Sequence, residues 1–199
     1  VVMLDLTIGA EKLFSQFSQT RRNEIRKAIK QQHVVTKALE TEAELVELYD
    51  IYCDWNVRKG HVPGSLEQLR LGVSQKENRR VIIATVDGKV VAGSFYRFSA
   101  GGIVEYAANV SLTEFQKLRP NDLIGWAAIQ WACESGFTKL GMGGSHLFLR
   151  RFGGEIVTTV AFVVKKAIPK QSLSCAVRLV DGTSEREKDV LLKEAITNR

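Results

Sequence analysis

Basic and titratable side chains in the second half of this sequence are of types that can act on a polar or anionic substrate. Lys117 and Arg119 stand close together before Pro120 and can bind an anion such as a phosphate through charge-assisted hydrogen bonds. His146 can serve as a general base near neutral pH. The Arg150 guanidinium can neutralise a developing oxyanion or hold a phosphate, but it cannot give up a proton at ordinary pH. The alternative for each of these side chains is an exposed surface charge.

A predicted strand carries a further group of candidate residues. Glu105 supplies a carboxylate that can accept a proton from a reacting group. Alternation along the strand places Glu105 and Ala107 on one face, and Tyr106 and Ala108 on the other. Tyr96, on the preceding strand, can hydrogen-bond across. The alternative is that these side chains cover a partly solvated face of a sheet.

The elements that position these side chains follow from turn and cap signals. Asp87-Gly88 favours a type I′ turn, in which both central residues need positive φ, and therefore predicts a hairpin. Pro120 and Gly136 are typical of the start of a helix and of the residue after its end. We therefore expect antiparallel strands over 80–86, 89–98 and 103–110, then a helix over 120–135 and a short strand that begins at Lys139-Leu140.

Other signals predict the elements around this centre. Apolar residues at helical spacing predict helices, and β-branched runs predict strands. A Ser or Thr followed three residues later by Glu or Gln predicts the start of a helix. On these grounds we expect a strand over 1–6, a helix over 9–31, a strand over 33–39, helices that begin at Thr41 and Ser65, a last core strand over 156–164, and a final helix capped by Ser184.

Composition limits the class of protein. The chain has 199 residues, of which 45% are hydrophobic, and this indicates a single domain over 1–199 with one good core. No apolar run approaches the ~20 residues of a membrane span, and the start lacks a signal-peptide pattern, so we expect a cytoplasmic protein. The 3 cysteines are widely spaced and indicate neither a disulfide framework nor a zinc site. The net charge of +6 favours an anionic partner, although solubility alone explains it equally well.

A longer pattern joins several of these features. The chain reads Pro120-Asn121-Asp122-Leu123, then an apolar run from Trp126 to Ala132, then the diglycine Gly143-Gly144, and then a basic element from Arg150 to Glu155. This order resembles the acyl-donor half of GNAT-fold N-acyltransferases, in particular the FemAB/FemX-like aminoacyl- and acyltransferases. Far upstream, the segment from Thr20 to Ala28 resembles the helix that opens the second domain of the same family. The resemblance covers most of the chain.

The resemblance implies both a fold and a reaction. It implies an α+β GNAT (acyl-CoA N-acyltransferase) fold with a mixed central sheet flanked by helices. The reaction would move an acyl or aminoacyl group from a CoA thioester or an aminoacyl-tRNA to an amine, in peptidoglycan or other envelope-glycan assembly. No tightly bound cofactor and no metal are expected, because attack on an activated ester requires only positioning, proton removal and oxyanion stabilisation.

Partners and domain organisation are implied in the same way. The acceptor would be an amine such as that of a nucleotide-sugar peptide, with no DNA partner and no membrane span, and a homo-oligomer is compatible with the pattern. FemAB-like proteins usually carry an additional GNAT-like half before this region. We therefore expect that the chain is the C-terminal half of a longer two-domain protein or a reduced single-domain relative.

The resemblance also assigns roles to residues. The donor's arm would lie along the strand 104–110, with its anionic groups at the helix start, where free N–H groups and the helix dipole attract them. The implied catalytic residues are Glu105, His146 and Arg150. The implied donor-binding residues are Tyr106, Asn109, Lys117, Leu118, Arg119, Asn121 and Asp122. The implied substrate-binding residues are Tyr96, Gly143, Gly144, Ser145 and Leu149.

Departures from the family pattern keep other functions open. The loop 116–122 contains no glycine, whereas CoA-dependent members normally carry a glycine-rich turn there. Gly141 stands where the family usually has Asp, and Leu149 stands where it has Lys. The alternatives are a catalytically silent GNAT-like domain used for binding or dimerisation, and a small-molecule N-acetyltransferase that uses acetyl-CoA.

Overall fold

The computed structural model describes residues 1–99, 102–166 and 173–178. The chain forms two compact units, 1–156 and 157–199. The first unit holds the strands β1 (Val2–Asp5), β2 (Val35–Ala38), β3 (Arg79–Val86), β4 (Lys89–Ser99), β5 (Ile103–Ser111), β6 (Lys139–Gly141) and β7 (Glu155–Ile156).

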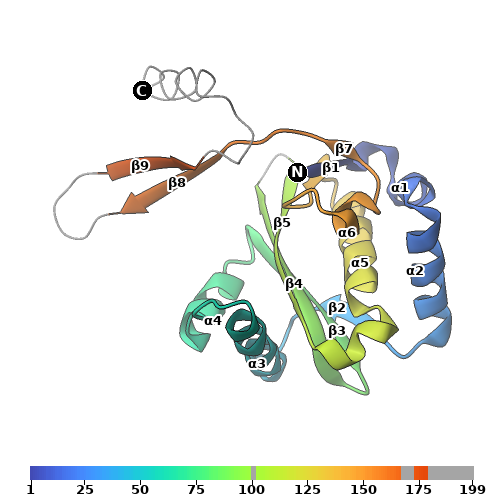
Figure 1. The fold of residues 1–199 in the computed structure, drawn as a ribbon, viewed down its shortest axis with the longest axis horizontal. Helices are drawn as coiled ribbons and strands as arrows, with labels where there is room; N and C mark the ends of the chain where they lie inside the picture. Colours follow the sequence, from blue (N-terminus) through green and yellow to red (C-terminus); the bar gives the residue numbers. More distant parts are fainter. Residues whose placement is uncertain (100–101, 167–172, 179–199) are drawn as a thin grey trace. The chain divides into compact units, whose positions relative to one another are not determined.

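These strands form one mixed sheet (Figure 1). It is seven-stranded, with the order β2-β3-β4-β5-β6-β1-β7. Its neighbouring strands are antiparallel except for β5 and β6, which run parallel. The mixed sheet and the antiparallel order of β3, β4 and β5 confirm the prediction from the sequence.

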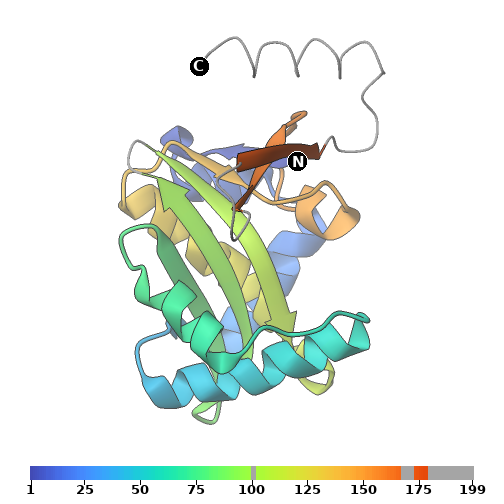
Figure 2. The same cartoon turned by 90° about the vertical axis from the view of Figure 1, so that its left-hand side faces the viewer.

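Helices cover both faces of the sheet. They are α1 (Ala10–Gln16), α2 (Gln19–Gln31), α3 (Glu42–Arg58), α4 (Leu66–Ser74), α5 (Pro120–Glu134) and α6 (Leu147–Arg150), with 3₁₀ turns η1 (Leu6–Ile8) and η2 (Thr113–Leu118). α3 and α4 lie in front of the sheet in Figure 2, whereas α5 packs on the opposite face and α2 packs against α5 (Figure 1). Among the helices that the structure describes, none is both long enough and apolar enough to cross a membrane.

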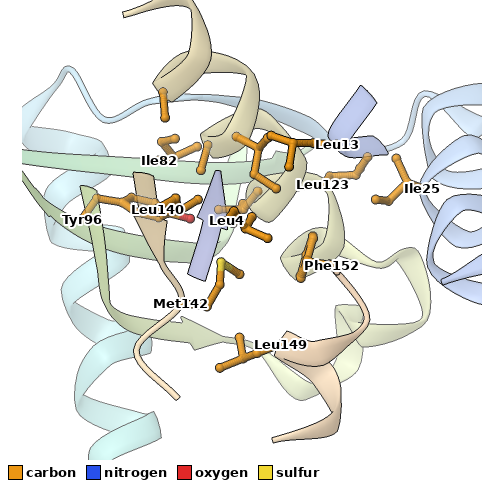
Figure 3. Close-up of a cluster of buried hydrophobic side chains, with 14 of the residues drawn as sticks. Leu4, Leu13, Ile25, Ile82, Tyr96, Leu123, Leu140, Met142, Leu149 and Phe152 are labelled. Atoms are coloured by element: carbon orange, nitrogen blue, oxygen red, sulfur yellow. The ribbon is translucent and has the colours of Figure 1, made fainter. Parts of the chain in front are cut away.

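Each face of the sheet has its own apolar core. On the α5 face, Leu4, Ile82 and Leu140 from three strands are buried against α5 (Figure 3). Burying side chains of this size contributes about 1.5–3 kcal/mol each. On the α3 face the buried residues are Leu48, Ile51, Val81, Ile83, Val90 and Val110. Because successive residues of β3 belong to different cores, the sheet is buried on both sides.

The turn and the helix starts predicted from short sequence patterns are present in the structure. Asp87 (φ 50°) and Gly88 (φ 81°) both have positive φ, as a type I′ turn requires. Both capping boxes are present. Thr41 and Ser65 each accept a hydrogen bond from a backbone N–H of the first turn, and the side chain at the third helical position accepts one from the backbone N–H of Thr41 or Ser65. The predicted hairpin and the starts of α3 and α4 are therefore confirmed.

The segment predicted as one helix over 9–31 is two helices. Ser18 begins α2, because its side chain accepts a hydrogen bond from the N–H of Arg21. Arg22 donates to the main-chain carbonyls of Ser15 and Phe17, where α1 ends. Apolar spacing continues across this break, so periodicity did not reveal it.

The prediction of a last core strand over 156–164 was wrong. β7 pairs with β1 over two residues only, Glu155 and Ile156. The next strand, β8 (Ala161–Lys166), belongs to the second unit and pairs with β9 (Leu173–Arg178) in a separate two-stranded sheet. A β-branched run favours extended backbone but does not select its partner. The predicted helix capped by Ser184 lies outside the described residues.

Candidate active site

β5 and β6 share a short parallel ladder and then separate. Residues 103–105 pair with residues 139–141. The chain then stays with β1, because the N–H of Met142 donates to the carbonyl of Val2 and the N–H of Val2 donates to the carbonyl of Gly144, both at 2.8 Å. Within the described residues, no strand pairs with 106–111 of β5 on this side. The main-chain polar groups along that edge are therefore available to an inserted ligand.

A β-bulge lies in β5 beside this opening. Tyr96 pairs with Tyr106 and Phe95 pairs with Ala108, so Ala107 is an extra residue on β5. The strict alternation expected for this strand therefore fails at Ala108, which follows its partner Phe95 to the face covered by α3.

Beyond the bulge, Asn109 joins a polar network on the α5 face. Its Nδ2 donates to Ser94 Oγ (2.9 Å) on β4 and to Asn121 Oδ1 (3.1 Å) in the first turn of α5. The Nδ2 of Asn121 donates in turn to Ser111 Oγ (3.2 Å). The structure thus brings together Asn109 and Asn121, two residues predicted to bind the donor, and ties the end of β5 to the start of α5.

Tyr96 and Tyr106 lie on this same face. Their ring centroids are 5.8 Å apart in an edge-to-face arrangement. Burial raises the pKa of Tyr106 to about 12, against a hydrogen bond from Ser94 that lowers it. Burial also raises the pKa of Tyr96 above its ordinary value. Both phenols are therefore neutral at physiological pH, and either can donate a hydrogen bond but neither can act as a base there.

Glu105 stands on the opposite face, where the parallel ladder ends. It is the last residue of β5 that pairs with β6. Its side chain is 53% exposed, and its Oε2 lies 3.1 Å from Nη2 of Arg97 on β4. A carboxylate at this point can accept a proton from a ligand held along the free edge of β5.

The diglycine lies at the opening between the strands. Gly143 has φ 69°, and an added Cβ would lie 2.5 Å from the main-chain oxygen of Tyr106. A Cβ on Gly144 would lie 3.3 Å from Cδ1 of Leu149. Both glycines thus lie close to neighbouring atoms, and at Gly143 this excludes every other residue type without a backbone shift.

A pocket of about 190 Å³ lies at the start of α5. Arg119 precedes α5 in the left-handed conformation (φ 60°), and its guanidinium pairs with Glu24 at 2.8 Å. The segment before it is the 3₁₀ turn η2, on which Lys117 is exposed and Leu118 is half-buried. The pocket is lined by Gln116, Arg119, Pro120, Asn121, Asp122 and Phe148, so the structure places Arg119 rather than Lys117 at its wall.

A buried ion pair holds one side of this pocket. Arg21 of α2 pairs with Asp122 of α5, and their side chains are 1% and 6% exposed. Nη2 of Arg21 also donates to the carbonyl of Phe148 (2.7 Å), and the guanidinium lies 4.2 and 4.3 Å from the ring centroids of Phe148 and Phe152. Burial lowers the pKa of Arg21 to about 10, against the nearby carboxylate of Glu24, so it is charged at neutral pH.

Sequence reasoning assigned Asp122 to the donor and gave Arg21 no role. In the structure Asp122 pairs with Arg21 and forms part of the pocket wall, and its role in donor binding stays a prediction. A usable signal was present, since an acidic residue in the first turn of an apolar helix needs a cation when that turn is buried. Nothing in the sequence pointed to Arg21 rather than to its neighbour Arg22 as that cation.

The remaining candidate site residues lie in and next to α6. His146 is exposed and begins α6, and the Nε of Arg150 donates to the carbonyl of Ser145 (2.6 Å). Leu149 is buried in the α5-face core (Figure 3). In the described part of the chain, no hydrogen bond or ion pair joins Glu105 to His146 or Arg150.

The chain belongs to the acetyltransferase (GNAT) domain family, whose model matches residues 15–152, more than half of the chain. The fold is accordingly the GNAT fold expected from the sequence, with the separation of β5 and β6 at its centre. GNAT acetyltransferases take the acyl group from a CoA thioester and transfer it to an amine. No curated protein matches the chain.

Solved structures of several acyltransferases share this fold. FemX is 12% identical, with a TM-score of 0.63 over 72% of this chain and 52% of FemX, so the chain spans about half the length of that protein. The C-terminal domain of a putative lysylphosphatidylglycerol synthetase from Agrobacterium fabrum is 12% identical (TM-score 0.54, 77% of this chain, 56% of that one). An aminoglycoside acetyltransferase from an uncultured soil metagenomic sample, solved with sisomicin, is 17% identical (TM-score 0.53, 68% of this chain, 99% of that one). At these identities the likeness shows the fold alone.

Proposed function

We propose that this chain is an N-acyltransferase whose acyl donor enters between β5 and β6 and whose acceptor amine approaches Glu105. The observation that carries this proposal is the separation of the two parallel strands after Glu105 and Gly141. It leaves a free main-chain edge on β5 that leads from Glu105 to the polar network at the start of α5.

The donor is proposed to lie along that edge. Main-chain groups of 106–111 can hydrogen-bond the amide groups of the donor's arm without regard to side-chain identity. Anionic groups of the donor fit the pocket at the start of α5, where the helix dipole and Arg119 favour negative charge. Because Arg119 is paired with Glu24, an incoming phosphate must share or replace that partner.

The chemistry follows from this arrangement. The amine nitrogen attacks the acyl carbonyl carbon, Glu105 accepts the proton that the amine loses, and the bond to the leaving sulfur or oxygen breaks. Main-chain N–H groups of β5 stabilise the oxyanion that forms during the attack. The leaving group departs as an anion and takes a proton from solvent.

The proposal extends to the donor, the acceptor and the pathway. A FemAB-like role in envelope-glycan assembly, with an aminoacyl-tRNA donor and a nucleotide-sugar peptide acceptor, is supported by the order of motifs and by the likeness to FemX. The net charge of +6 favours a polyanionic donor such as tRNA. The compact η2 in place of a glycine-rich turn also favours it, because phosphate would then be held by side chains.

Transfer assays with two donors test the proposal. The protein is incubated with acyl-CoA thioesters or with aminoacyl-tRNA and a panel of amines, and product is measured by mass spectrometry. Glu105→Gln should lower kcat by about 10²–10⁴ because it removes the general base. The matched control Glu11→Gln removes an exposed carboxylate from α1 and should leave kcat unchanged. An unchanged kcat in Glu105→Gln would exclude Glu105 as the base.

A silent binding domain is the second candidate. It is favoured by Leu149, which occupies the core at the position where the family has a lysine, and by Gly141, which offers no carboxylate. In that case the donor binds but neither donor is turned over with any amine in the panel. Equilibrium binding of CoA and of tRNA, measured beside the transfer assay, separates the two candidates.

A further inference from the structure

Another pocket lies on the other face of the sheet from the start of α5. Its volume is about 360 Å³, and it lies between α4 and the strands β3, β4 and β5. Leu69 and Val73 of α4 and Phe95 of β4 form its apolar lining. Arg79, Arg80 and Arg97 also line it. The guanidinium of Arg80 lies 4.7 Å from the ring centroid of Trp131 on the α5 face, so Arg79 and Arg97 are the arginines of this face. A pocket with apolar walls and a few charged groups is typical of a site for a small ligand.

Arg79 and Arg97 lie beside each other on neighbouring strands, on the same face of the sheet. Arg79 of β3 and Arg97 of β4 are direct cross-strand partners in an antiparallel ladder. They share a face with Val81 and Phe95, the next partners along the ladder that point toward α3 and α4. Like charges directly opposite each other destabilise a sheet. An anion bound between the two side chains would remove this repulsion.

The neighbouring groups neutralise only one of these charges. Arg97 pairs with Glu105 at 3.1 Å. Arg79 donates to the carbonyl and the side-chain oxygen of Asn78, at 3.1 and 3.3 Å, and has no carboxylate partner among the residues that the structure describes. The row across β3, β4 and β5 thus carries two positive charges and one negative charge.

The pocket reaches the strand that carries Glu105. Ala107, the extra residue of the bulge, lies in its wall, two residues from Glu105 on the same strand. On the α4 side, an added Cβ on Gly72 would meet no atom within 4 Å, so the wall is open there. A ligand bound at the arginines therefore lies next to β5, the strand along which the donor is proposed to bind.

We infer that this pocket holds the acceptor, and that the acceptor carries a carboxylate or a phosphate which Arg79 and Arg97 bind while its amine reaches Glu105. The inference deepens the function proposed above and rests on it. The anion of the acceptor competes with Glu105 for Arg97. Binding of the acceptor thereby frees the Glu105 carboxylate from its ion pair where a proton acceptor is needed.

A binding experiment tests the anion site without requiring turnover. The probes are 6-aminohexanoate, its uncharged amide and 3-aminopropyl phosphate, all with a distant primary amine, titrated by calorimetry into the full chain. The carboxylate or the phosphate should bind at least tenfold more tightly than the amide, because charge-assisted hydrogen bonds are lost in the amide. The comparison of the two anions identifies the preferred group.

Variants assign this preference to the arginines. Arg79→Gln and Arg97→Gln should each reduce the preference for the anion at least tenfold, with no change in the affinity for the amide. Lys89→Gln is the control, since Lys89 is exposed at the other end of β4 and carries the same charge. Arg79→Lys keeps the charge but loses the planar fork, and should retain part of the preference. Equal binding of all three probes, or a preference unchanged in Arg79→Gln and Arg97→Gln, would refute the inference.

Transfer assays with the same probes separate this inference from the proposed function. Transfer to the amide and to the anions at equal kcat/KM would keep the acyltransferase and overturn the anion site. Anion-selective binding without transfer from either donor class would refute the acyltransferase, and with it the assignment of the anion as part of an acceptor. Anion-selective transfer that disappears in Arg97→Gln supports both.

Discussion

Replacing Arg21 by methionine should destabilise the protein by about 3–5 kcal/mol, because it leaves a buried carboxylate without its cation. Asp122 is 4% exposed and lies in the first turn of α5, where Arg21 is its ion-pair partner. Methionine keeps a flexible apolar stem between the rings of Phe148 and Phe152, so most of the packing is retained. The loss therefore measures the charge rather than a cavity.

The size of the effect follows from what Arg21 joins. It holds α2 to α5 through Asp122 and to the α6 segment through the carbonyl of Phe148 at 2.7 Å. A hydrogen bond to a charged group is typically worth about 1.5–3 kcal/mol. The penalty for leaving the Asp122 carboxylate in an apolar site adds to this. Since whole domains are stable by about 5–15 kcal/mol, the single variant should lose about a fifth or more of its stability.

Asp122→Asn should also be destabilising, because it leaves the Arg21 guanidinium buried without its anion. The double variant Arg21→Met with Asp122→Asn removes both charges, and its loss should be smaller than the sum of the single losses by about 2–3 kcal/mol. Lys27→Met is the control, since Lys27 is exposed on the same helix and should change stability by less than about 0.5 kcal/mol.

Urea unfolding at 25 °C, followed by circular dichroism and by tryptophan fluorescence, measures these four variants. Additive losses in the double variant, or a loss below about 1 kcal/mol in Arg21→Met, would show that the pair does not hold the helices as described. Because Asp122 and Phe148 line the pocket at the start of α5, Arg21→Met should also weaken donor binding in a folded sample.

Further variants test the surroundings of the site and the start of α3. Gly143→Ala should cost about 2 kcal/mol or more of stability in urea unfolding and should lower the rate of transfer, because φ is 69° and the added Cβ meets a main-chain oxygen at 2.5 Å. Gly141→Ala is the control: the atom nearest to its added Cβ is at 3.6 Å, so it should cost under about 1 kcal/mol. Leu149→Lys should cost more than about 3 kcal/mol through a buried charge, and a cost near that of Leu149→Met would contradict its place in the core. Hydrogen bonding to Lys37 lowers the pKa of Glu44 from 4.5 to about 2. The ionised Glu44 side chain therefore makes its full contribution to the stability of the folded chain above pH 4.5, and this contribution is lost as the pH falls through 2. Glu44→Gln keeps the capping box, so its stability difference from the native chain should shrink between pH 5 and 2 in urea titrations, and a constant difference would contradict the shift.

The candidate site was only partly predictable, and particular residues show why. Asn109 and Asn121 were both expected to bind the donor, and the structure places them in hydrogen-bond contact. Their roles in donor binding stay predictions. Arg79 and Arg97 were not singled out at all, because each is an ordinary strand residue until the register of β3 against β4 places them opposite each other.

Leu149 is the opposite case, a residue that the sequence pattern singled out but that the structure buries in the core. Its place in the family pattern suggested that it contacts substrate, whereas its side chain is 2% exposed in the α5-face core. Motif position gives the place of a residue in the chain, but the direction of its side chain within a short helix depends on how that helix packs.

The sequence by itself determined the elements whose causes are local. The positive φ of Asp87-Gly88, the capping boxes at Thr41 and Ser65, and the start of α5 at Pro120 each depend on residues within a few positions of one another. The tertiary structure alone decided where β5 leaves β6, which residue of β5 is extra, and which arginine meets Asp122. These features join segments far apart in the chain, and their free energy comes from packing and desolvation that exist only when those segments meet.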